Sequence, residues 1–130
     1  MVLRGIPFFE VAEDLDMAGL HWAPEIGDEV TRRDDIQRVS ILVDPHGMTP
    51  GELRATYLWL PSVEQMVLQI ESRQAILFHS GLELGNSSFC YKTVLSWKNE
   101  MFESYADSFR NSMGIALRDL LLTREKRLVN

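Results

Sequence analysis

The most regular pattern of apolar and polar positions lies at the C-terminal end of the chain. After Asp107, apolar residues recur every three or four positions, a spacing that places them on one face of an α-helix. They are Phe109, Met113, Ala116, Leu117, Leu120 and Leu121. Burial of this face contributes roughly 10 kcal/mol before the entropy of ordering is subtracted. The pattern therefore predicts a C-terminal helix, capped by Asp107, that packs against the rest of the protein.

A period of two in the middle of the chain predicts a β-hairpin. In residues 75–84 all even positions except Ser80 are apolar, and in residues 89–97 the odd positions carry the large apolar side chains. Because both sets must face the same core, an even position has to pair with an odd one, and the four-residue loop 85–88 allows this. The expected pairs are Leu84 with Phe89, Leu82 with Tyr91, Ser80 with Thr93, Phe78 with Leu95 and Ile76 with Trp97.

Three further elements are expected between residues 38 and 74. The β-branched and apolar residues 39–43 predict a strand, which the turn-forming residues 44–47 end. The sequence Thr49-Pro50-Gly51-Glu52 is typical of a helix start, since threonine caps the first turn and glutamate reaches back to it. This helix is expected to reach about Trp59, and Pro61 to open a second helix that ends at about Arg73.

Together these elements predict an α+β fold with an antiparallel sheet of three to four strands and helices packed on one face. A short third strand is expected at residues 102–105, after the hairpin. Residues 1–37 show only a loose helical spacing with Gly and Pro breaks, so either a short helix or an irregular arm is expected. The length fits a single domain, 1–130, with residues 1–37 as a less regular acidic arm and 38–130 as the core.

The charge is unevenly distributed and limits the classes of partner. The net charge is −6, and residues 1–30 account for all of it, with seven acids against Arg4 alone. An acidic surface repels phosphate backbones, which disfavours nucleic acid as a partner. No apolar run approaches the roughly 20 residues of a membrane-spanning helix, and the first residues do not resemble a secretion signal. A soluble protein in the cytoplasm, with no membrane partner, is therefore expected.

Common catalytic and nucleotide-binding motifs are absent from the sequence. It contains no glycine-rich phosphate loop, no nucleophile elbow and no zinc-protease or EF-hand motif. The three histidines stand 25 and 33 positions apart, so neither a metal site nor a cofactor is expected. Cys90 is the only cysteine. In the expected register it lies roughly 13 Å from His79, which excludes a Cys–His catalytic pair.

One candidate ligand or partner surface follows from the hairpin register. His79, Glu83 and Lys92 fall on the outer face, where Glu83 and Lys92 are diagonal neighbours roughly 7 Å apart at the backbone. Gly81 leaves a notch between them, and His79 adds a group that can transfer protons near neutral pH. The alternative interpretation is a solvated sheet face with one weak ion pair.

The sequence does not define a function. The missing catalytic motifs favour a non-enzymatic interaction or regulatory module with a protein partner, and the alternative is a small-molecule binder or an enzyme without a recognisable motif. Leu77 and Val94 are expected on the outer hairpin face, and Leu128 and Val129 have no evident place in the core. Apolar surface of this kind indicates self-association as a homodimer. Alternatively, residues 1–37 fold over this face.

Overall fold

The computed structural model describes residues 5–85 and 88–129, and within them it shows an α+β fold with four helices and two antiparallel three-stranded sheets. The helices are α1 (Phe8–Met17), α2 (Pro50–Thr56), α3 (Val63–Ser72) and α4 (Phe109–Val129). Sheet A consists, in spatial order, of β2 (Asp35–Ile41), β1 (Glu29–Arg32) and β3 (Tyr57–Trp59). Sheet B consists of β4 (Ile76–Leu84), β5 (Phe89–Trp97) and β6 (Glu100–Ala106). The predicted α+β class is confirmed, although the strands divide between two sheets.

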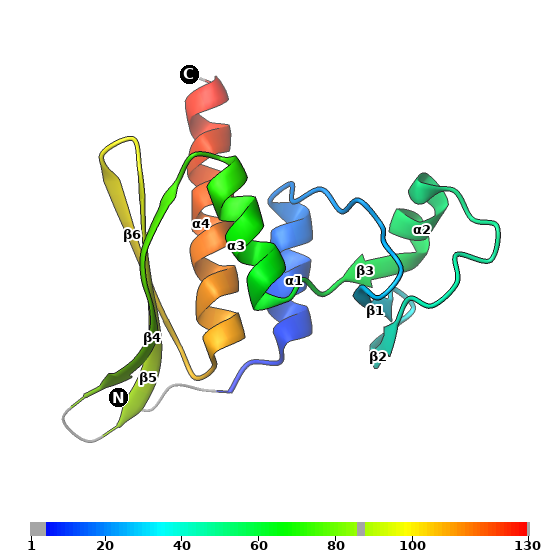
Figure 1. Ribbon diagram of the computed structural model, residues 1–130, viewed down its shortest axis with the longest axis horizontal. Helices are drawn as coiled ribbons and strands as arrows, with labels where there is room; N and C mark the ends of the chain where they lie inside the picture. Colours follow the sequence, from blue (N-terminus) through cyan, green and yellow to red (C-terminus); the bar gives the residue numbers. More distant parts are fainter. Residues whose placement is uncertain (1–4, 86–87, 130) are drawn as a thin grey trace.

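Helices α1, α3 and α4 lie between the two sheets (Figure 1). Helix α4 packs against one face of sheet B, as predicted, and α1 and α3 pack against α4. Sheet A and α2 lie beyond α1, which touches β3. The main core is therefore built around α4, whose Met113, Leu117 and Leu120 are fully buried. Among the described residues, no helix is both long enough and apolar enough to cross a membrane.

The start of α4 differs by one residue from the prediction. The hydroxyl of Ser108, and not the carboxylate of Asp107, accepts a hydrogen bond from the Asn111 backbone N–H at 3.1 Å. One turn later, Gly114 faces α1 at close range, since an added Cβ would lie 2.5 Å from Cγ1 of Val11. The absence of a side chain at Gly114 is thus what allows the two helices to approach.

A row of hydroxyl groups joins sheet B to α4 inside the core. Thr93 Oγ1 lies 2.8 Å from Ser80 Oγ and 2.9 Å from Ser112 Oγ, and Ser112 donates to the Phe109 carbonyl at 3.0 Å. Ser104 donates to the Ser112 carbonyl at 2.6 Å. Each of these hydroxyls has a partner, so the cost of their desolvation is offset by hydrogen bonds. These contacts show that α4 covers the face of β5 that carries Thr93.

Arg110 fixes α4 relative to sheet A. Its guanidinium donates to the backbone carbonyls of Leu60 and Pro61 at 2.6 and 2.9 Å, and it forms an ion pair with Glu29 at 2.9 Å. The Phe8 ring lies 4.1 Å from the guanidinium carbon. One side chain therefore connects α4, β1, the end of β3 and α1.

The first predicted helix begins where expected, but it is shorter than predicted. Thr49 and Glu52 form the predicted capping box, with hydrogen bonds of 3.1 Å in both directions. The helix stops at Thr56, however, and residues 57–59 form β3 instead of a last helical turn. Pairing of β3 with β1 buries Leu58 and Trp59, and this tertiary contact outweighs the local helical pattern. The second helix is confirmed as α3, which begins after Ser62 and not at Pro61.

The strand predicted at 39–43 is β2, which begins four residues earlier and ends at Ile41. Three of the four residues 35–38 are polar, and this segment was not expected to be extended. They tolerate this because β2 is an edge strand whose side chains are nearly all exposed. The short strand predicted at 102–105 is the centre of β6. In residues 5–37 the structure contains α1, β1 and the start of β2.

The predicted hairpin register is correct at one end and wrong at the other. Three pairs are confirmed: Leu84 with Phe89, Leu82 with Tyr91 and Ser80 with Thr93. A β-bulge between Leu77 and His79 then inserts Phe78, so Leu77 pairs with Leu95 and Ile76 with Ser96. Leu77 consequently packs against the core and does not lie on the outer face. Of the predicted loop, residues 86 and 87 are outside the described part.

Candidate functional site

The β4–β5 hairpin extends past the start of α4 (Figure 1), and apolar side chains near its turn are exposed. Leu82, Leu84 and Phe89, called the hairpin patch here, are 54%, 76% and 66% exposed. By strand alternation they share the face on which Thr93 and Leu95 are buried beneath α4. The sequence predicted this face correctly, but the expectation that all of its apolar residues are buried is wrong.

The length of the helix layer explains this exposure. The first residue of α4 is Phe109, whose ring stacks on Tyr91 with centroids 6.0 Å apart. Tyr91 is thus the last hairpin residue that α4 reaches on this face. Leu82 is paired with Tyr91, and the Leu84–Phe89 pair lies two residues farther toward the turn, where no described element covers the hairpin patch. Phe109 itself is partly exposed and continues the apolar surface.

The predicted polar surface is assembled on the opposite face of the hairpin. Glu83 Oε1 lies 3.7 Å from His79 Nε2 and 3.9 Å from Lys92 Nζ. Lys92 also pairs with Glu103 of β6 at 3.9 Å and lies over the Tyr105 ring, 5.5 Å from its centroid. The structure therefore brings His79, Glu83 and Lys92 together, and it adds two residues that the hairpin register alone did not include.

Lys92 is held in its charged form by these neighbours. A hydrogen bond with Tyr105, together with the negative charges of Glu103 and Glu83, raises the pKa of Lys92 above its ordinary value. A lysine with a raised pKa does not act as a general base near neutral pH. Cys90 is opposite Glu83 in the ladder and is not paired with His79. Among the described residues, no group of three His, Cys, Asp or Glu side chains is placed to hold a metal ion.

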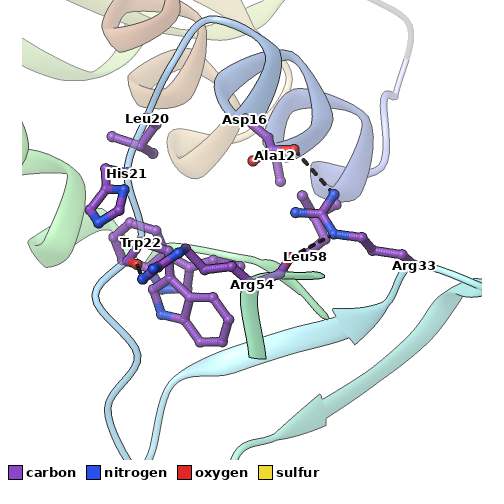
Figure 2. A pocket seen from close by; sticks show the side chains of 9 residues that line it. Ala12, Asp16, Leu20, His21, Trp22, Arg33, Arg54 and Leu58 are labelled. Atoms are coloured by element: carbon purple, nitrogen blue, oxygen red, sulfur yellow. Dashed lines mark hydrogen bonds and ion pairs between the residues drawn. The ribbon is translucent and has the colours of Figure 1, made fainter. Parts of the chain in front are cut away.

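A separate cavity lies between α1, the loop after it, and sheet A with α2 (Figure 2). Its volume is about 120 Å³. The lining residues are Ala12, Asp16, Leu20, His21, Trp22, Arg33, Arg54, Leu58 and Trp59. They come from parts of the chain up to 47 positions apart, from Ala12 to Trp59, and no local sequence pattern marks them as a set.

The polar groups of this cavity are mostly hydrogen-bond donors. Arg33 donates to Asp16 at 3.1 Å and to the Arg54 carbonyl at 2.9 Å, which leaves Asp16 and Arg33 neutral as a pair. Arg54 donates to the Trp22 carbonyl at 3.1 Å and forms no ion pair with any described residue. The indole N–H of Trp59 is buried and has no partner among the described residues. The cavity therefore has one uncompensated cation, the guanidinium of Arg54.

Two stacked indoles form the apolar wall of the cavity. The rings of Trp22 and Trp59 lie 6.5 Å apart with an interplanar angle of 15°. Asp28 holds Trp22 in place by accepting its indole N–H at 2.8 Å, and Gln65 donates to the same carboxylate at 2.7 Å. Trp22 is buried in the structure.

Comparison with protein-family models, with curated proteins and with solved structures finds no match for this chain.

Proposed function

We propose that the protein is an interaction module that acts as one domain and self-associates through the hairpin patch. The observation that carries the proposal is the exposure of Leu82, Leu84 and Phe89 on a single face next to Phe109. A contiguous apolar surface costs free energy in water, and on soluble proteins it usually marks a contact with another molecule. A cytoplasmic location is part of the proposal, and it is supported by a single cysteine that has no partner for an intrachain disulfide.

A second copy of the chain is the partner that suits this surface best. The hairpin patch contains no charged residue, so bringing two copies together opposes no like charges there. The acids of residues 10–30 lie on α1, the loop after it and sheet A, on the other side of α4 (Figure 1). β4 is also an edge strand, which permits backbone pairing around a twofold axis.

Charge placed in the hairpin patch tests the proposal. In sedimentation equilibrium at micromolar concentration, the wild-type chain is expected to have twice the mass of one 14.9 kDa chain. Leu84→Glu and Phe89→Glu are each expected to raise the dissociation constant at least about tenfold, because a carboxylate would be desolvated in the contact. Both side chains are exposed, so the thermal unfolding of the monomer should change little.

Val43→Glu is the matched control. Val43 is 74% exposed and follows β2, far from the hairpin, so this substitution should leave association unchanged. A wild-type mass of one chain throughout the concentration range would contradict the proposal. The same loss of association in Val43→Glu and Leu84→Glu would also contradict it, since the effect would then come from net charge and not from the patch.

The polar group His79, Glu83 and Lys92 lies on the face of the hairpin opposite the patch, and we propose that it lines the outer edge of a contact made along the edge strand β4. Interfaces commonly surround an apolar centre with polar side chains that contribute little affinity. We expect His79→Ala, Glu83→Ala and Lys92→Ala each to weaken association by less than about fivefold and to change stability by less than about 1 kcal/mol. A larger loss of affinity in the sedimentation experiment would place the centre of the contact on this outer face.

A further inference from the structure

We propose that the cavity between α1 and sheet A binds a small monocarboxylate, with Arg54 as the residue that holds the carboxylate group. The cavity lies between α1 and sheet A, away from the hairpin patch (Figure 1), so this site is independent of the proposed self-association. Figure 2 shows Leu20 and His21 on one side of the cavity, Asp16 on another, and Arg54 and Trp22 along its lower edge.

The charge in the cavity selects an anion. The carboxylate of Asp16 is already bound by Arg33, so it does not neutralise Arg54. One N–H of the Arg54 guanidinium is used by the Trp22 carbonyl, which fixes the position of the side chain and leaves further donors for a ligand. A planar carboxylate matches this donor geometry and can accept two hydrogen bonds from one guanidinium.

The two indoles serve as the apolar wall of the site. The indole N–H of Trp22 is bound to Asp28, and that of Trp59 is buried away from water, so neither is assigned a hydrogen bond to the ligand. Arg54 therefore supplies the hydrogen bonds to the carboxylate, and the rings contact the hydrocarbon part of the ligand.

The volume and the lining side chains of the cavity further limit the class of ligand. A dry cavity of about 150 Å³ in another protein accommodates benzene, so 120 Å³ suits a molecule of about four to six heavy atoms. The stacked indoles, Leu20 and Leu58 offer apolar contact to a short hydrocarbon chain. These properties favour a carboxylate with two to four carbons over phosphate, which would leave the apolar wall without a partner.

Titration with sodium propionate, followed through the indole N–H resonances, tests this site. The Trp59 resonance is expected to shift in a saturable manner, and the resonance of Trp97, which lies outside the cavity, is expected to stay in place. Propionamide has nearly the same shape without the charge and should cause no saturable shift. Arg54→Gln should weaken propionate binding at least about tenfold, because it removes the charge and the bidentate donor.

Arg38→Gln is the matched control for the loss of one positive charge. Arg38 lies on the exposed strand β2, outside the cavity, so its variant should bind propionate like the wild type. Arg54→Lys serves where Arg54→Gln fails to fold, and it should bind more weakly because lysine lacks the bidentate geometry. Equal shifts with propionamide, a preference for phosphate over propionate, or no saturable shift in the wild type would each overturn the proposal.

Discussion

Replacing Asp28 by alanine is expected to lower the free energy of unfolding by about 3 kcal/mol or more. The buried carboxylate accepts three hydrogen bonds, from the Trp22 indole at 2.8 Å, the Glu25 backbone N–H at 3.0 Å and the Gln65 amide at 2.7 Å. Removing it leaves one buried donor, the Trp22 indole, and two partly buried donors without their acceptor. Chemical denaturation monitored by circular dichroism measures the change.

Asp28→Asn and Asp44→Ala separate this effect from the loss of a carboxylate in general. An asparagine side chain has one acceptor oxygen, where aspartate has two. Gln65 cannot rotate its amide to compensate, because its side-chain oxygen already accepts a hydrogen bond from the Ser62 backbone N–H. Asp28→Asn should therefore lose about 1 to 2 kcal/mol. Asp44 lies in an exposed turn and accepts one backbone bond, so Asp44→Ala should lose less than about 1 kcal/mol. Equal losses in Asp28→Ala and Asp44→Ala would contradict the argument.

Gly114→Ala is expected to destabilise the protein by about 1 to 3 kcal/mol, although alanine is the better helix former by about 1 kcal/mol. The new Cβ would meet Val11 Cγ1 at 2.5 Å and Phe8 Cε1 at 3.3 Å. A β-branched valine on a packed helix has few alternative rotamers, so α1 has to move away from α4. Thermal and denaturant unfolding of the variant measure the loss.

Gly51→Ala is the control for intrinsic helix propensity. At Gly51 an added Cβ would find its nearest neighbour at 3.9 Å, so this variant should be as stable as the wild type or more stable by up to about 1 kcal/mol. In addition, Val11→Ala should relieve the clash. The loss of unfolding free energy in the double variant Val11→Ala with Gly114→Ala should therefore be smaller than the sum of the losses in the two single variants. A Gly114→Ala protein more stable than wild type would show that the helices do not meet closely here.

Features controlled by local chemistry could be predicted from the sequence. The capping box at Thr49 and Glu52 and the apolar stripe of α3 depend on residues a few positions apart, and both are present. The turn chemistry of the hairpin likewise determines the pairs nearest the loop, from Leu84 with Phe89 to Ser80 with Thr93. For the same reason, alternation along the two strands is enough to predict that His79, Glu83 and Lys92 are neighbours on the outer face.

Features that depend on distant contacts could not be predicted in this way. The bulge at Phe78 shifts the register of β4 at the end away from the loop, and no residue pattern in the hairpin predicts this bulge. Residues 57–59 become a strand because β1, almost 30 positions earlier, offers an edge to pair with. The exposure of Leu84 depends on where α4 begins, and the cavity around Arg54 depends on several elements meeting. Alternation identifies the face of a strand, but the extent of the covering layer decides whether that face is buried.

Amide hydrogen exchange at increasing protein concentration tests most directly whether the hairpin patch is a contact surface. As the concentration rises about a hundredfold from the low micromolar range, protection of residues 82–84 and 89–91 should increase, because mass action favours the associated form. Protection of β1 and β3, at the other end of the molecule, should stay constant. Exchange that is independent of concentration in the hairpin, or that slows equally in β1 and β3, would contradict the assignment of the contact to the hairpin patch.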